Sequence, residues 1–356
     1  MNLDELRKRI DQCDRELVRL LNERTEFVLG IGALKKDRGG EIYVPAREKE
    51  VLDKVTALNE GPLKDQSISA VYREIMSASL ALEHPVQIAY LGPRATFTHQ
   101  AARSKFGASV QYIASETIRD VFELVECAST DYGVVPIENS TEGAVTHTLD
   151  QFAGATVKIC AEIYLNISHN LLAQGTQDEV EKIYSNPQVF GQCRNWLHEN
   201  MPAVDLIPVS STAKAAEMAA KDKTAGALAS HLAAELYALN LLRADVQDSG
   251  GNATRFLVLA KEFGTATGTD KTSLLFTVRH KAGALHGALH AFSQFNINMS
   301  KIESRPSKGM AWEYMFFVDI EGHVEDENVS CAMENLSEHC SMVTVLGSYP
   351  AASKTP

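Results

Sequence analysis

The sequence predicts a multidomain chain with three classes of structure in series: an all-α segment, a two-lobed α/β segment and a small α+β segment of the ferredoxin-like type. Three observations predict this order. Apolar residues follow a helical period from Leu3 to about Lys36. From Val86 the pattern changes to short apolar strands that alternate with helices, which is typical of α/β domains. The last segment has the order β-α-β-β-α-β. The predicted domains are residues 1–84, 86–262 and 271–350.

Composition excludes several classes of protein. The 356 residues are 45% hydrophobic and 22% charged, as in an ordinary globular protein of two or three domains. No apolar run approaches 18 residues and the N-terminus does not read as a signal peptide, so we expect a cytoplasmic protein that does not bind a membrane. The net charge of −12 without a basic stripe argues against a nucleic-acid partner. The six cysteines form no C-x-x-C pair and the histidines form no ligand pattern, so we expect neither a metal nor another cofactor.

The first helix has a heptad seam that is apolar except at Arg24. Such a long apolar face needs other helices to cover it, plausibly including a second copy of itself. Two interpretations of Arg24 stay open at this point: a register device paired with Glu23 or Glu26 of a neighbour, or a ligand for an anion inside the bundle. The seam consists of Leu6, Ile10, Cys13, Leu17, Leu20, Arg24, Phe27, Ile31 and Leu34.

Two shorter helices are expected to complete the first domain. An extended piece at 42–44 leads to Pro45, a good first-turn residue, and the second helix runs from Ala46 to Asn59. Ser67 is the expected N-cap of the third, which ends near Glu83. One long and two short helices lack a core partner, which again points to an intertwined dimer.

The middle segment is expected to form parallel sheets in two lobes separated by a cleft. Ligands bind outside the carboxyl ends of such strands, and the region 166–175 reads as loop. The predicted strands are 86–91, 110–113, 131–138, 157–167, 181–185, 204–209, 224–230 and 254–260.

The last segment follows a linker at 263–270 that is rich in Gly and Thr. Its predicted strands are 273–278, 298–305, 310–320 and 342–348, and its predicted helices are 283–295 and 326–340. It contains no catalytic constellation, and small domains of this type usually bind a ligand or dimerise.

Basic residues of the first helix are placed to bind an anion. Arg24 and Lys35 are eleven residues apart, which puts them ~20° from the same face and ~16 Å apart along the axis, close enough to clasp a small dianion. Arg7 lies ~25 Å from Arg24, so only an antiparallel partner helix would bring it to the same ligand.

These residues, with the motifs around Arg47-Glu48 and Ser79-Leu80-Ala81-Leu82-Glu83, resemble the all-helical chorismate mutase family. The resemblance implies that Arg24 and Arg7 of the opposite chain hold the two carboxylates of chorismate, with help from Arg47. Lys35 would donate to the ether oxygen, Glu48 would take the ring hydroxyl, and Ser79 would belong to the polar pocket. Glu83 stands where enteric members carry Gln as a second donor, so we expect Glu83 to be protonated. Val44 stands where many members have Asp.

Three loops of the middle segment together resemble prephenate dehydratase, although each alone reads as ordinary turn or capping chemistry. They are the stretches 90–98, 135–143 and 250–256, and Asn252-Ala253-Thr254-Arg255-Phe256 is the most specific of them. The resemblance implies a two-lobed, periplasmic-binding-protein-like fold that converts prephenate to phenylpyruvate. Thr254 would donate a hydrogen bond to the departing hydroxyl and Arg255 would anchor a carboxylate. The family usually has Gly where Ala95 stands. The expected lining residues are Thr96, Thr98, Asn139, Ser140, Asn252 and Phe256.

The last segment resembles the ACT domain of the same enzymes. Two stretches carry the resemblance, Gly283-Ala284-Leu285-His286 and Ile302-Glu303-Ser304-Arg305-Pro306. It implies that Gly283, Ala284, Leu285, His286, Glu303, Ser304 and Arg305 bind the end product L-phenylalanine across a dimer interface. Inhibition would follow if phenylalanine prefers a less active arrangement.

The hypothesis from sequence is therefore a bifunctional enzyme of phenylalanine biosynthesis that forms a homodimer or homotetramer. Two alternatives stay open. One is an enzyme that dehydrates arogenate. The other is a non-catalytic small-molecule sensor in which the helices serve as an oligomerisation arm.

Overall fold

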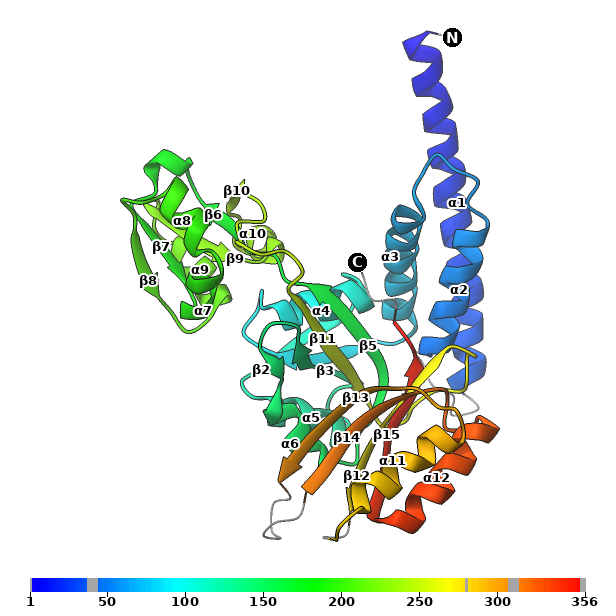
Figure 1. Cartoon of the computed structure of the whole chain (residues 1–356). Coiled ribbons are helices and arrows are strands. Elements are labelled where there is room, and N and C mark those ends of the chain that lie inside the picture. Colours follow the sequence, from blue (N-terminus) through cyan, green and yellow to red (C-terminus); the bar gives the residue numbers. More distant parts are fainter. Residues whose placement is uncertain (1, 37–43, 279–280, 307–313, 353–356) are drawn as a thin grey trace. The chain divides into compact units, whose positions relative to one another are not determined.

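The computed structural model describes residues 2–36, 44–278, 281–306 and 314–352 (Figure 1). Most of the extended piece predicted at 42–44 lies outside them. The chain forms two compact units, one made of Met1–Gln87 and Lys105–Gln111, the other of Ile88–Ser104 and Tyr112–Pro356. The third predicted domain therefore shares a unit with most of the second, of which residues 86–87 and 105–111 belong to the helical unit.

The helical unit contains α1 (Leu3–Lys36), α2 (Pro45–Ala57) and α3 (Asp65–Glu83), and both α1 and α2 pack against α3. The predicted cap Ser67 is wrong, because α3 starts earlier with Lys64 as N-cap and the Ser67 N–H donates to the Lys64 carbonyl. The seam of α1 is largely uncovered in the single chain, where Leu17, Phe27 and Leu34 are 56%, 68% and 63% exposed. Among the described helices, none is long and apolar enough to cross a membrane.

The first lobe of the second unit is a sheet in the order β2-β1-β3-β11-β5, with β4 paired to β3. The prediction of parallel sheets is wrong here. β1 runs parallel to β3, but β11 runs antiparallel to both β3 and β5. The strands are β1 (Gln87–Leu91), β2 (Gln111–Ser115), β3 (Tyr132–Asn139), β4 (Gly143–Ala144), β5 (Lys158–Asn166) and β11 (Ala253–Ala260), and the helices are α4 (Phe97–Phe106), α5 (Ile118–Glu126) and α6 (Thr146–Phe152).

The second lobe is a mixed sheet in the order β10-β6-β9-β7-β8 with helices against both faces. β7 is parallel to β8 and β9, whereas β6 is antiparallel to β9 and β10. The short apolar run of β6 lies in the stretch that the sequence suggested was loop. The elements are β6 (Asn170–Ala173), a 3₁₀ turn η1 (Gln177–Glu179), β7 (Lys182–Ser185), α7 (Pro187–Gln192), α8 (Arg194–Asn200), β8 (Asp205–Pro208), α9 (Thr212–Ala219), β9 (Ala225–Ala229), α10 (His231–Tyr237) and β10 (Asn240–Arg243).

The C-terminal segment has the predicted β-α-β-β-α-β order and a four-stranded antiparallel sheet β13-β14-β12-β15. One face packs against α11 and α12. The other face shares a core with the first lobe, in which Phe317 and Tyr349 lie with Ile137 and Leu257. A Cβ at Gly347 would lie 2.0 Å from the Ile159 carbonyl oxygen, so glycine permits the close approach of β15 to β5. The elements are β12 (Asp270–Val278), α11 (Ala284–Gln294), β13 (Met299–Pro306), β14 (Tyr314–Glu321), α12 (Glu327–His339) and β15 (Cys340–Pro350).

Candidate active sites

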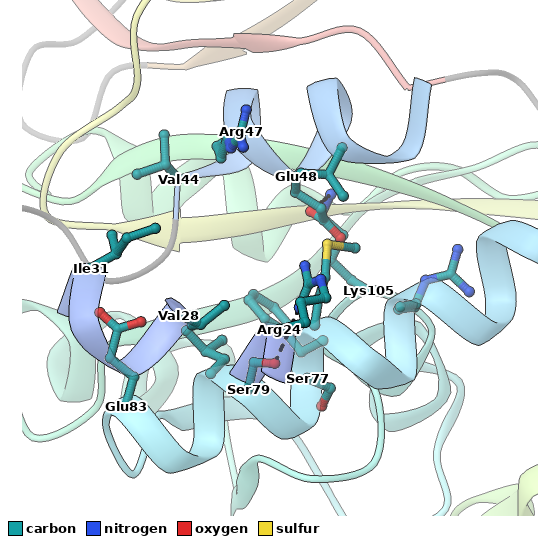
Figure 2. Close-up of a pocket in the computed structure, with 15 residues that line it drawn as sticks. Arg24, Val28, Ile31, Val44, Arg47, Glu48, Ser77, Ser79, Glu83 and Lys105 are labelled. Carbon is teal, nitrogen blue, oxygen red and sulfur yellow. Dashed lines mark hydrogen bonds and ion pairs between the residues drawn. The ribbon is translucent and has the colours of Figure 1, made fainter. Parts of the chain in front are cut away.

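A pocket of about 220 Å³ lies inside the helical unit and gathers most of the residues predicted for the first reaction (Figure 2). Five of them line it: Arg24, Arg47, Glu48, Ser79 and Glu83. Two further cations, Arg73 and Lys105, line it as well. Four cations against two carboxylates make the pocket suited to an anionic ligand.

Arg24 faces this pocket, and Ser79 holds its head group. The Arg24 Nη1 donates to Ser79 Oγ at 3.4 Å (Figure 2). The Ser79 Oγ in turn donates to the Ile75 carbonyl at 2.9 Å. Ser79 thus uses its proton inside its own helix and offers a lone pair to the guanidinium. In this structure the Ser79 side chain therefore positions Arg24.

Glu48 and Arg47 are neighbours in sequence with different environments. Glu48 is 9% exposed, and Lys105 Nζ lies 2.7 Å from its Oε2. Arg47 is exposed and donates to Glu50 at 2.5 Å. Lys105 could not be predicted for this pocket, because it lies about 60 residues beyond Glu48 at the end of α4. Arg73 lies on α3 four residues before Ser77 and seven before Leu80, and all three line the pocket, as the helical period allows.

Glu83 sits half-buried at the end of α3 beside Gly32 of α1. A Cβ at position 32 would lie 2.6–2.8 Å from the Glu83 Cγ, Cδ and Oε1 atoms. Because Gly32 has no side chain, the Glu83 side chain can occupy this space. Gly32 thus serves the packing of α1 against α3, whereas a Cβ at Gly30 would meet nothing within 4 Å.

One predicted residue, Arg7, is not among the described residues that line the pocket. Arg7 lies near the start of α1, with a side chain 68% exposed and 4.0 Å from Asp4. This position agrees with the ~25 Å between Arg7 and Arg24 that the helical rise predicts. The side chain of Lys35 lies outside the described residues.

A second cleft, of about 320 Å³, lies in the other unit and gathers six residues predicted for the second reaction. They are Thr96, Thr98, Asn139, Asn252, Thr254 and Phe256. Each comes from one of the three predicted loops, so the loops do converge.

Asn139 and Thr254 form the best-defined pair in this cleft. The Asn139 Nδ2 donates to Thr254 Oγ1 at 2.8 Å and to Asn252 Oδ1 at 2.8 Å. Its Oδ1 accepts the N–H groups of Thr141 and Glu142, which fixes the orientation of the amide. Because the Thr254 oxygen already accepts a hydrogen bond, its hydroxyl proton is available for a ligand, and the accepted bond polarises it.

The structure corrects two predictions for this cleft. Arg255 does not line it, because successive strand residues point to opposite faces and Arg255 lies between Thr254 and Phe256. Its side chain is buried and paired with Glu162 and Asp319, so it cannot also anchor a carboxylate in the cleft. Ser140 is used to close the loop: its Oγ donates to the Gly251 carbonyl and accepts the Ala253 N–H.

The loop before α4 contains an alanine in an unusual backbone conformation. Ala95 is buried with φ 71°, a left-handed conformation in which glycine is favoured. The Ala95 N–H donates to His99 Nδ1 at 3.1 Å, and its carbonyl accepts from Ser230 Oγ. Burial, and then Arg103 and Arg94, lower the pKa of His99 to about 4, so the ring is neutral and remains an acceptor.

Several cleft residues from the second lobe were missed. His169 is 2% exposed, and its Nε2 lies 2.7 Å from Gln192 Oε1. Burial lowers the pKa of His169, and the bond to Gln192 opposes this only in part. The neutral ring then donates from Nε2 and leaves Nδ1 as a buried acceptor that has no partner among the described residues. The other polar residues missed are Asn186, Gln188, Gln192, Ser210, Ser211 and Thr212 of the second lobe and Glu142 of the first. Asn186 and Ser211 gave a signal, because both cap a helix directly after a predicted strand.

Among the described residues that line this cleft there is no lysine or arginine. Its donors are hydroxyls, amides and the N-terminus of α9, where Ser211 and Thr212 line the cleft. A helix N-terminus presents unpaired N–H groups to anions. The cleft can therefore bind a carboxylate without a cationic side chain.

The residues predicted to bind phenylalanine lie in two places of the C-terminal segment. Gly283 is the N-cap of α11 with φ 78°, and Ala284, Leu285 and His286 form the first turn. Glu303, Ser304 and Arg305 lie on β13, the edge strand of the sheet. Arg305 donates to Asp150 of α6 at 3.1 Å.

Comparison with known families supports the division into three segments. Residues 6–84 match the family model described as Chorismate mutase type II, residues 88–263 match Prephenate dehydratase, and residues 272–336 match ACT domain.

Individual relatives cover three quarters of the chain or more. A protein of Aquifex aeolicus named bifunctional chorismate mutase/prephenate dehydratase is 51% identical over 98% of both chains. The structure of an Arthrobacter aurescens prephenate dehydratase in complex with L-Phe is 32% identical, with a TM-score of 0.70, and covers 76% of this chain and 92% of its own. A structure described as GqqA, a novel type of quorum quenching acylase, is 30% identical, with a TM-score of 0.68, and covers 75% of this chain and 98% of its own.

Proposed function

Because this chain belongs to the family of bifunctional chorismate mutase/prephenate dehydratases, we propose that its two pockets catalyse consecutive steps, chorismate to prephenate and prephenate to phenylpyruvate. The chain is an enzyme of both kinds, an isomerase and a carbon–oxygen lyase. One observation carries the assignment of the sites: two separate pockets, one around Arg24 and one around Thr254, lie in the segments that match the two families in order.

In the helical pocket the reaction is pericyclic, so no nucleophile or covalent intermediate is needed. The pocket has to hold the reactive conformer and stabilise negative charge on the breaking ether oxygen. We assign Arg24 and Arg47 to the carboxylates and Glu48 to the ring hydroxyl. Lys35 and a protonated Glu83 are the proposed donors to the ether oxygen.

A second copy of the chain would complete this site. The exposed apolar seam of α1 needs a cover, and an antiparallel α1 would bring Arg7 of the partner to Arg24. The test is complementation between Arg7→Ala and Arg24→Ala, each inactive alone. Half of the mixed dimers are heterodimers with one intact site of two, so mixing should restore about a quarter of wild-type activity. No recovery after subunit exchange would refute the shared site.

In the second cleft the ring carboxylate leaves as CO2 and its bonding electrons aromatise the ring, which expels the hydroxyl. The hydroxyl departs as water after taking a proton from solvent. Thr254 donates a hydrogen bond to that oxygen as charge develops on it. The carboxylates are bound by the N-terminus of α9 and by hydroxyls such as Thr98, in place of Arg255.

We further propose that L-phenylalanine regulates the enzyme through the C-terminal segment. The Arthrobacter aurescens relative was solved in complex with L-Phe. The proposed ligands are Gly283 to His286 and Glu303 to Arg305. Since β13 is an edge strand, a second copy of this sheet can approach it.

The experiment follows both reactions in one sample. Loss of chorismate and gain of phenylpyruvate are measured for the wild type, Arg24→Ala and Thr254→Ala. Thr254→Ala should accumulate prephenate, and Arg24→Ala should convert added prephenate only. Arogenate supplied in place of prephenate tests the arogenate alternative. If the wild type consumes neither chorismate nor prephenate, the sensor alternative would remain. Fold alone does not decide the function, because a structure with a similar fold is described as an acylase.

A further inference from the structure

The two strands that carry Asn139 and Thr254 are bound on their other face to the C-terminal sheet. Thr254 pairs with Asn139 across β11 and β3, and the next pair is Arg255 with Glu138. Asn139 and Thr254 line the cleft. Glu138 and Arg255 make ion pairs with Lys301 of β13 and Asp319 of β14.

Arg255 is the centre of a buried network with balanced charge. Its Nε donates to Glu162 Oε2 at 2.7 Å, its Nη1 donates to Asp319 Oδ2, and its Nη2 donates to Tyr349 Oη at 3.0 Å. Lys271 of β12 donates to both oxygens of Glu162 at 2.7 and 2.8 Å. Two cations thus meet two carboxylates, and none of the four side chains is more than 9% exposed.

A chain of hydroxyls closes the network into a ring. Ser273 Oγ donates to Asp319 Oδ1 at 2.5 Å. Ser273 and Tyr349 are 2.6 Å apart, and since the Ser273 proton is already used, Tyr349 is the donor of that bond. Burial raises the pKa of Tyr349 well above its usual value, and Asp319 adds to the effect, so the phenol keeps its proton. Arg255 therefore reaches Asp319 both directly and through Tyr349 and Ser273.

The fixed partners of Arg255 restrict movement of the backbone at Thr254. Every polar atom of the Arg255 head group is directed at a fixed partner, and removal of one partner leaves an uncompensated buried charge. Thr254 is joined to Arg255 by one peptide bond, so a shift of Arg255 toward a new partner moves the Thr254 hydroxyl. A displacement of about 1 Å can cost a catalytic group about a hundredfold in rate.

We propose that Arg255 is a positioning residue for the dehydratase reaction, which holds the Thr254–Asn139 pair in place through its bonds to Glu162 and to Asp319 and Tyr349 of the C-terminal sheet. The proposal rests on the proposed dehydratase function of the cleft. It assigns Asp319 and Tyr349 an effect on catalysis although neither lines the cleft.

The test uses Asp319→Asn and Tyr349→Phe in the full chain. Both variants should lower the kcat for prephenate, Asp319→Asn by about tenfold to a hundredfold, with KM within about twofold and mutase kcat unchanged. Tyr349→Phe keeps the ring and serves as the milder variant if Asp319→Asn folds poorly. Lys158→Met is the matched control, since Lys158 also joins the first lobe to the C-terminal sheet, through the Val345 carbonyl at 2.8 Å. It should leave kcat unchanged.

Hydrogen exchange supplies a readout that needs no activity. Backbone amides of β11 and β3 should exchange faster in Asp319→Asn than in the wild type or in Lys158→Met. Unchanged kcat together with unchanged exchange would overturn the proposal. So would Arg255→Lys that raises KM and leaves kcat intact, because that pattern identifies a substrate anchor. A wild type inactive on prephenate, with faster β11 exchange in Asp319→Asn, would refute the dehydratase assignment but not the structural role.

Discussion

Replacing Asn139 by aspartate alters one atom of the pair that supports Thr254. In the structure Asn139 Nδ2 donates to Thr254 Oγ1 at 2.8 Å, and backbone N–H groups hold the other side of the amide. An ionised aspartate keeps the shape but presents an oxygen that accepts only. The Thr254 proton would then bind the aspartate, and the leaving hydroxyl of the substrate would lose its donor.

The size of the effect follows from the bond that is lost. A hydrogen bond to a group that carries charge is worth about 1.5–3 kcal/mol, which corresponds to roughly 10- to 150-fold in kcat. Added negative charge in a cleft whose described lining holds no lysine or arginine should also raise KM for the anionic substrate. Phenylpyruvate formation from prephenate measures both constants, and the mutase activity of the same sample reports on folding.

A double-mutant cycle separates the action of Asn139 through Thr254 from a direct effect on the substrate. If Asn139 acts through the threonine hydroxyl, Asn139→Asp in a Thr254→Ala background should not lower kcat further. Thr254→Ser is the matched control, because it keeps the hydroxyl. Additive losses in the double variant, or an Asn139→Asp enzyme with kcat within twofold of the wild type, would refute the reasoning.

Three further predictions concern single residues. Ala95→Val should destabilise the protein by about 2 kcal/mol or more, because a β-branched side chain is strained at φ 71° in a packed site, whereas Ala95→Gly should be nearly neutral; urea midpoints measure both. The pKa of His99 falls from 6.5 to about 4 on folding, so its contribution, roughly 3 kcal/mol, is present above pH 6.5 and lost as the pH falls to 4. His99→Gln should flatten that part of the dependence of the urea midpoint on pH, and an unchanged slope would contradict it. Glu83→Gln should keep the mutase kcat and Glu83→Ala should lower it, because the proposed role of this side chain is to donate a hydrogen bond to the ether oxygen; a Glu83→Ala enzyme with unchanged mutase kcat would contradict that role.

The helical pocket was largely predictable because a helix has a fixed period. Arg24 interrupts an otherwise apolar seam, and its geometric relation to Arg7 follows from the rise per residue alone. Ser79 and Glu83 came from the family resemblance, and the helix spacing of four residues places both on one side of α3. The period cannot reach Lys105, because nothing in a local pattern brings the end of α4 to α2.

The wrong prediction that Arg255 lines the cleft could have been avoided from the sequence alone. The resemblance supplied Thr254 and Arg255 as a pair, and proximity in sequence suggested a shared site. In a strand, adjacent side chains point to opposite faces. Thr254 and Phe256 therefore belong to the cleft, and Arg255 belongs to whatever packs on the other side. The identity of that neighbour, the C-terminal sheet, was beyond reach, because it depends on contacts between residues as distant as Arg255 and Tyr349.

The wrong prediction of parallel sheets also bears on why the cleft forms where it does. In a parallel sheet the ligand lies beyond the carboxyl ends of the strands, which would place the end of β11 near Ala260 at the cleft. Thr254 is instead the second residue of β11. Because β11 returns antiparallel between β3 and β5, its start meets the end of β3, and Thr254 pairs with Asn139. The reversal of one strand thus joins the last residue of β3 to the first residues of β11, and it leaves the opposite face of both strands to the ion pairs with the C-terminal sheet.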